Sequence, residues 1–173
     1  MASVGIELQN MTLGQSKYPA AQIESLIWLS KQIMKRHKIL PHNVVGHSDV
    51  APTRKVDPGV SFPWTEMAKH KLGILPNKQM VTSRKRMNTL LHEIGYDVTD
   101  EKAALFAFMR YFMPERVPLD KEILKMEENL SAYITVAAKT DKEVMLRLNK
   151  VAYAYKQARF SQNLLDKRIG GRG

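Results

Sequence analysis

Apolar residues recur along the chain at two spacings, and each spacing predicts a different element. Between Ser3 and Leu8 every second residue is apolar, which is typical of a strand with one buried face. Glu7 would point away from that face. From Pro19 to about Lys38 the apolar residues fall three or four positions apart, which predicts an amphipathic helix with a proline in its first turn.

The next segment predicts a second short strand and a polar loop. Asn43 to His47 forms a brief apolar run that would deliver His47 to a strand end. Ser48 to Gly59 is polar and shaped by prolines and a glycine. A short helix is expected from Thr65 to about Leu72, and residues 73–82 are expected to form a linker.

The remaining residues predict helices only, so we expect an α/β fold followed by an all-α region. We expect three parts, residues 1–75, 76–115 and 116–173, and a disordered tail from Ile169. The predicted helices are Ser83–Ile94, Glu101–Phe112, Leu119–Lys139 and a last one that opens at the capping-box sequence Thr140-Asp141-Lys142-Glu143 and runs to about Lys167.

Composition narrows the class of protein. The chain has 173 residues, of which 44% are hydrophobic, so it can bury a core. Because it has no cysteine, disulfide scaffolds, thiolate zinc clusters and cysteine nucleophiles are excluded, and any metal must use histidine and carboxylates. It contains no apolar run long enough to span a membrane, and its N-terminus lacks the pattern of a secretory signal. The sequence as written is therefore expected to remain in the cytoplasm, whereas a longer parent could be periplasmic; the compartment stays open.

The net charge of +10 favours anionic partners without identifying one. It is spread along the chain, with 9 basic and 5 acidic residues in 1–76 and 18 and 12 in 77–173. The run Arg84-Lys85-Arg86 is interpreted as a solvated helix face rather than a phosphate contact. A nucleic-acid-binding function rests on charge alone and is not expected.

The residues best suited to chemistry lie between Gly46 and Gly59. His47 would stand at a strand end, and Asp57 follows ten residues later on a loop that can fold back, which suits a His and Asp pair on zinc. Lys55 could place a cation beside a substrate oxygen. Taken alone, a histidine and an aspartate this far apart are more often structural than metal-binding.

The string from Gly46 to Trp64 resembles the C-terminal signature of zinc-dependent N-acetylmuramoyl-L-alanine amidases of the amidase type 2 family. Residues 4–8 and the Tyr18-Pro19 helix match that family in order, so the resemblance covers residues 3 to about 72. Such enzymes cleave the amide between the lactyl group of N-acetylmuramic acid and L-alanine in peptidoglycan. Their catalytic domain is a mixed sheet flanked by helices.

The resemblance implies that His47 and Asp57 are zinc ligands, Glu7 the general base and Lys55 the cation that stabilises the oxyanion. A catalytic zinc usually has three protein ligands, and the family takes another histidine from an early strand that this chain lacks. We therefore expect a partial amidase domain, the C-terminal half, with little activity alone. Thr53 also replaces a common glycine. The other histidines, His37, His42, His70 and His92, are expected to be solvated or packing residues.

Residues 82–115 are similar to the helical peptidoglycan-binding module that follows the catalytic domain in some of these amidases. Their aromatic residues are at least as readily explained as core: Phe106, Phe108, Tyr111 and Phe112. Residues 116–173 predict only a helix pair.

Two functions from different classes remain open. One is a zinc amidase acting on peptidoglycan or muropeptides, present in truncated form, with completion by a second polypeptide that supplies the missing strands as one variant of this hypothesis. The other is a non-catalytic peptidoglycan-binding or interaction protein derived from such an amidase.

Overall fold

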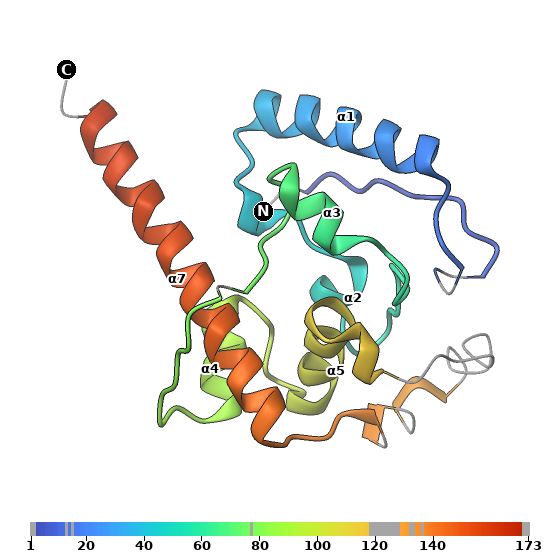
Figure 1. Cartoon of the computed structure of the whole chain (residues 1–173), viewed down its shortest axis with the longest axis vertical. Coiled ribbons are helices and arrows are strands. Elements are labelled where there is room, and N and C mark those ends of the chain that lie inside the picture. Colours follow the sequence, from blue (N-terminus) through green and yellow to red (C-terminus); the bar gives the residue numbers. More distant parts are fainter. Residues whose placement is uncertain are drawn as a thin grey trace.

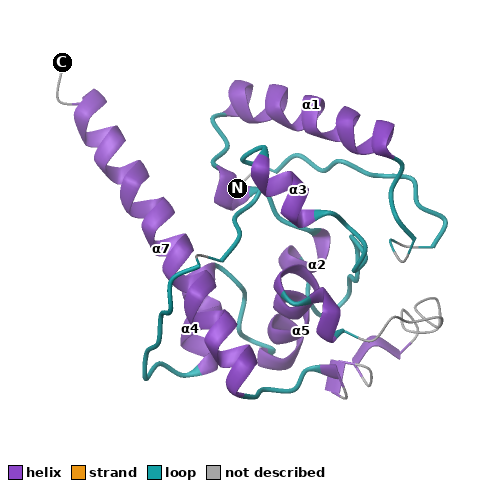
Figure 2. Cartoon of the chain, viewed as in Figure 1, coloured by secondary structure: helices purple, strands orange, loops and turns teal. Residues whose placement is uncertain are grey.

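The structure is a computed structural model that describes residues 3–12, 14, 16–76, 78–117, 129–131, 134–135 and 137–170, with side chains given as far as residue 163. All regular secondary structure in this part of the chain is helical (Figure 2). The elements are α1 (Ala20–His37), η1 (Pro41–Asn43), α2 (His47–Val50), α3 (Trp64–Lys69), α4 (Met87–Ile94), α5 (Glu101–Phe112), η2 (Pro114–Arg116) and α7 (Lys142–Gly170).

The predicted α/β fold, a partial mixed sheet of the amidase type, is wrong for the described residues, which contain no strand. The two expected strands fail for different reasons. Residues 3–8 form an irregular segment, and a strand exists only when a neighbour pairs with its backbone groups. In place of a strand from Asn43 to His47, Pro41 opens a 3₁₀ turn and His47 begins α2.

The helix predicted near Pro19 is confirmed as α1, which ends where Lys38 adopts a left-handed conformation with φ 53°. In Figure 1, the irregular N-terminal segment runs beside α1. The amide Nε2 of Gln22 donates a hydrogen bond to the Gln9 carbonyl at 3.1 Å. Trp28 of α1 is 65% exposed. The N-terminal segment is therefore held by a helix and not by a sheet.

Helix α5 is the centre of the molecule. Its residues 103–112 are all buried, and it begins where the Asp100 side chain accepts hydrogen bonds from the backbone N–H groups of Lys102 and Ala103. The bounds predicted from the sequence, Glu101–Phe112, are confirmed. The aromatic residues of this helix lie in the core, as one of the two interpretations expected.

Helices α4 and α7 lie side by side, and α7 extends beyond the other helices at its C-terminal end (Figure 1). The buried apolar residues that the structure describes in α7 repeat at helical spacing: Val144, Leu148, Val151, Ala152 and Tyr155. Burying one large apolar side chain stabilises the fold by about 1.5–3 kcal/mol. The predicted final helix is confirmed. Most of the predicted helix Leu119–Lys139 and the last three residues of the tail lie outside the described residues.

One hydrophobic core joins α1 and α3 to the later helices. It contains Ile23 and Leu26 of α1, Trp64 of α3 and the buried face of α5. The Trp64 ring stacks on that of Tyr111, with centroids 3.8 Å apart. The three-part division of the chain remains a prediction, but residues on both sides of its first boundary share this core.

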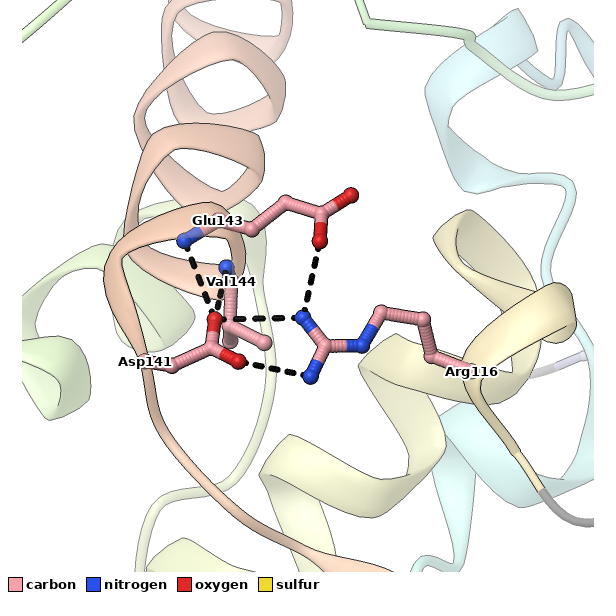
Figure 3. Close-up of polar contacts among 4 residues, drawn as sticks. All are labelled: Arg116, Asp141, Glu143 and Val144. Atoms are coloured by element: carbon pink, nitrogen blue, oxygen red, sulfur yellow. Dashed lines mark hydrogen bonds and ion pairs between the residues drawn. The ribbon is translucent and has the colours of Figure 1, made fainter.

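Arg116 holds the start of α7 against the end of η2 (Figure 3). Its guanidinium donates to both carboxylate oxygens of Asp141, at 3.1 and 2.6 Å, and to Glu143 at 3.0 Å. Asp141 also caps α7 by accepting hydrogen bonds from the N–H groups of Glu143 and Val144. The cap thus comes from Asp141 rather than from the threonine of the capping-box sequence.

This cluster predicts a loss of stability in acid. The Arg116 guanidinium and the backbone N–H groups lower the pKa of Asp141 to about 2, from an ordinary value of 3.8. A lowered folded-state pKa stabilises the protein above the ordinary value, and this contribution is lost as the pH falls from about 4 towards 2. Denaturant unfolding should therefore show wild type more stable than Asp141→Asn at pH 6, with the difference shrinking below pH 4. A difference that does not change with pH would contradict this.

Candidate functional site

The structure brings His47 and Asp57 together, as the sequence predicted for a metal pair. The Nδ1 atom of His47 lies 3.0 Å from Oδ2 of Asp57, and each side chain is about half exposed. His47 is the first residue of α2, and Asp57 stands where the following loop returns. We call residues 46–59 the site loop. Two potential metal ligands therefore sit side by side on an accessible surface.

Close backbone contacts fold the site loop back on itself. The N–H of Ser48 donates to the Asp57 carbonyl oxygen at 2.8 Å. Gly46 lies so near Pro58 that a Cβ at position 46 would come within 2.7 Å of the proline Cδ. The absence of a side chain at Gly46 is what allows the two ends of the loop to approach.

The helical region supports this loop through two side chains. The Tyr96 hydroxyl, just after α4, donates to Oδ1 of Asp49 at 2.7 Å, and Oδ2 of Asp49 accepts the Gly46 N–H at 2.7 Å. The buried Arg110 of α5 donates from Nη2 to the Val56 carbonyl. Both ends of the site loop are therefore attached to the helices.

Asp49 is a half-buried carboxyl group of α2, two residues after His47. Burial raises the pKa of Asp49 to about 6, against the hydrogen bonds from Tyr96 and Gly46 and the nearby Arg110 charge, which lower it. Burial also raises the pKa of Tyr96 well above its ordinary value. Tyr96 thus stays a hydrogen-bond donor throughout the physiological range.

The other two predicted site residues do not contact the pair. Glu7 is exposed on the N-terminal segment and Lys55 is half-buried in the site loop. Among the described residues, no hydrogen bond or ion pair joins either side chain to His47 or Asp57. Their roles as base and oxyanion-stabilising cation remain predictions.

The remaining histidines lie in other surroundings. His37 is exposed at the end of α1, and the His42 ring packs edge-on near Tyr155. His70 contacts Glu66 and Lys31, and His92 lines an open depression beside Gly95. In the described part of the chain, no group of three histidine, aspartate or glutamate side chains is placed to hold a metal ion.

The donor atoms of the His47–Asp57 pair can be compared with the ligands that zinc takes in proteins. Zinc bound by a histidine nitrogen and a carboxylate oxygen has bonds of about 2.0–2.2 Å in tetrahedral geometry, which separates two neighbouring ligand atoms by roughly 3.3 Å. The 3.0 Å between His47 and Asp57 is close to this value. One imidazole and one carboxylate are donor types that zinc takes, but no third donor completes the set among the described residues.

Asp49, Tyr96 and Arg110 were not predicted from the sequence as parts of the site. The sequence does indicate a role for Arg110, because it is a charged residue inside the apolar run of α5. A charge that is buried with its helix needs a hydrogen-bond acceptor. Asp49 and Tyr96 gave no such signal, because a hydrogen bond across 47 residues leaves no local pattern.

The start of the chain is related to a known class of enzymes. Residues 1–60 match the family model described as N-acetylmuramoyl-L-alanine amidase. The predicted resemblance to such amidases is confirmed for this segment, which includes the whole site loop.

Individual relatives extend the similarity further. AmiD from Escherichia coli K12, an N-acetylmuramoyl-L-alanine amidase, is 37% identical over 137 residues, covering 65% of this chain and 50% of AmiD. The 1,6-anhydro-N-acetylmuramyl-L-alanine amidase AmpD from Enterobacter cloacae is 40% identical over 63 residues, covering 36% of this chain and 33% of AmpD.

A solved structure is also similar. It is the complex of Escherichia coli AmiD with the substrate anhydro-N-acetylmuramic acid-L-Ala-D-gamma-Glu-L-Lys, with a TM-score of 0.58 and 28% identity, covering 82% of this chain and 55% of that one. The chain thus spans about half of AmiD and a third of AmpD.

Proposed function

We propose that this chain carries half of the active site of an N-acetylmuramoyl-L-alanine amidase. The reaction would hydrolyse the lactyl amide between N-acetylmuramic acid and L-alanine in peptidoglycan or muropeptides. The observation that carries the proposal is the His47–Asp57 pair, 3.0 Å apart, on a loop related to those amidases.

Each proposed role follows from the chemistry of the side chain. His47 and Asp57 would hold a zinc ion, which when bound polarises a carbonyl and lowers the pKa of a water molecule. Glu7, exposed to solvent, would act as the general base that accepts a proton and passes it to the leaving amine. Lys55 would stabilise negative charge on the carbonyl oxygen. With two ligands in place of three, affinity for zinc should be weak and turnover by this chain low.

The test is hydrolysis of anhydro-N-acetylmuramic acid-L-Ala-D-gamma-Glu-L-Lys by the purified chain with zinc added. We expect slow release of the peptide that stops with a chelator and falls at least tenfold in His47→Ala and in Asp57→Ala. His92→Ala is the matched control, since this exposed histidine lies outside the site. Equal turnover in all the variants would contradict the proposed roles.

A second candidate is a non-catalytic muropeptide-binding protein. The observation that favours it is the lack of a third metal donor in the part of the chain that the structure describes. Binding of the same muropeptide without any hydrolysis, with or without zinc, would favour this function over the first.

We further propose that a second polypeptide supplies the missing strands and ligand. Val4 is 52% exposed and Ile6 is 37% exposed on a segment that pairs with no strand among the described residues. Such apolar extended segments tend to associate.

In the described part of the chain, no helix is both long and apolar enough to cross a membrane.

This arrangement predicts that the purified chain self-associates at micromolar concentration. The double variant Val4→Lys, Ile6→Lys should shift it towards the monomer, because charged side chains oppose pairing of an exposed segment. Sedimentation velocity measures the change. A monomeric wild-type chain with a sharp unfolding transition would contradict the missing-strand proposal.

A further inference from the structure

Within the site loop, the backbone hydrogen bond from Ser48 to Asp57 and the hydrogen bond from Gly46 to Asp49 hold the two ends together. α2 is one turn long and ends at Val50, which is 70% exposed. A helix this short is not stable on its own. Contacts from outside the loop therefore add to the internal ones in holding His47 beside Asp57.

At the His47 end, the support is a chain of hydrogen bonds that starts in the helical region. Tyr96 is 5% exposed, and its ring packs edge-on against Phe108 with centroids 6.4 Å apart. Its hydroxyl donates to Asp49, and Asp49 accepts the N–H of Gly46, the residue before His47. A rigid core tyrosine therefore fixes the first turn of α2.

At the Asp57 end, the support is Arg110. This side chain is 3% exposed, and its guanidinium lies over the Phe106 ring, 5.4 Å from the centroid. It donates to the carbonyl of Val56, which directly precedes Asp57. Hydrogen bonds from a charged donor to a buried acceptor are among the stronger ones in proteins.

We propose that Tyr96 and Arg110 are positioning residues for the His47–Asp57 pair, so that the helical region after residue 82 sets the geometry of the site. Both residues lie outside the segment 1–60 that matches the amidase family. That this positioning serves catalysis rests on the proposed amidase function. The positioning of His47 and Asp57 can be measured on the chain without any turnover.

The test is amide hydrogen exchange at Ser48, whose N–H closes the loop onto the Asp57 carbonyl, compared in wild type and Tyr96→Phe at pH 7.5. The variant keeps the packed ring and removes the hydroxyl. We expect exchange at Ser48 to accelerate about tenfold and the His47 ring NMR signals to shift, while exchange at Val151 in α7 stays within twofold. Asp49→Asn, which alters the acceptor, should have the same local effect.

Tyr155→Phe is the matched control, because Tyr155 is equally buried and, among the described residues, its hydroxyl makes no hydrogen bond to the site loop. It should leave Ser48 exchange and the His47 signals unchanged. Unchanged Ser48 exchange in both Tyr96→Phe and Asp49→Asn would overturn the proposal, and so would equal acceleration at Ser48 and Val151. Absence of amidase turnover would count only against the proposed function.

Discussion

Replacing Phe108 by alanine is expected to lower the free energy of unfolding by about 3–5 kcal/mol. The Phe108 ring is fully buried in α5 and contacts Phe112, with ring centroids 5.0 Å apart, as well as Tyr96. Its removal leaves a cavity among rings that cannot all move in to fill it. Since small domains are stable by only about 5–15 kcal/mol, urea unfolding should show a large part of the stability lost.

The matched control for this change is Phe160→Ala. Phe160 is the same residue type on α7 but is 60% exposed, so its loss should change the free energy of unfolding by about 0.5 kcal/mol or less. Similar losses in the two variants would mean that α5 is not the centre of the core. A further consequence of Phe108→Ala is faster hydrogen exchange in the site loop, because Tyr96 loses the ring against which it packs.

The helices were predictable because their signals are local. The bounds Glu101–Phe112 follow from apolar periodicity, and residues 103–112 are indeed buried. Helix α4 begins at Met87 rather than at Ser83. Ser83 instead donates its hydroxyl to the Asn149 side chain of α7 at 2.5 Å. The contact of Ser83 with a residue 66 positions later therefore influences the conformation of the first residues of the predicted helix. No local sequence pattern indicates such a contact.

The two strands failed because a strand is not a local element. Residues 3–8 alternate as a strand should, but alternation only allows pairing and does not supply the partner. At Asn43–His47, local chemistry favoured turns, since Pro41 suits the first position of a 3₁₀ turn and Asp49 bonds back to Gly46. The sheet predicted from these two patterns is therefore wrong for the described residues, which contain no strand.

The candidate site was half predictable. His47 and Asp57 are ten residues apart on one loop, and a family resemblance was enough to pair them. The residues that hold this loop come from much further along the chain: Tyr96 lies 47 residues from Asp49, and Arg110 lies 54 residues from Val56. Because such contacts depend on how α4 and α5 pack, they become visible only in the folded chain.

Replacing Gly46 by alanine is expected to open the site loop. The new methyl group would lie 2.7 Å from Cδ of Pro58 and 3.1 Å from Oδ2 of Asp49, and a proline ring cannot swing aside. Overpacking of this kind typically costs about 1–3 kcal/mol. The loop can relieve the clash only by moving Pro58, and Asp57 with it, away from His47. NMR should then show the His47 ring signals shifted, and any zinc-dependent turnover should fall at least tenfold.

Gly5→Ala provides the control for Gly46→Ala, because a Cβ at Gly5 meets nothing within 4 Å. It should leave both the free energy of unfolding and the His47 signals unchanged, apart from a small gain of order 0.5 kcal/mol from a less flexible unfolded chain. If Gly46→Ala behaved in the same way, the close approach of Gly46 and Pro58 would not be what pairs His47 with Asp57. The pairing would then depend on Tyr96 and Arg110 alone, and their variants would be expected to carry the whole effect.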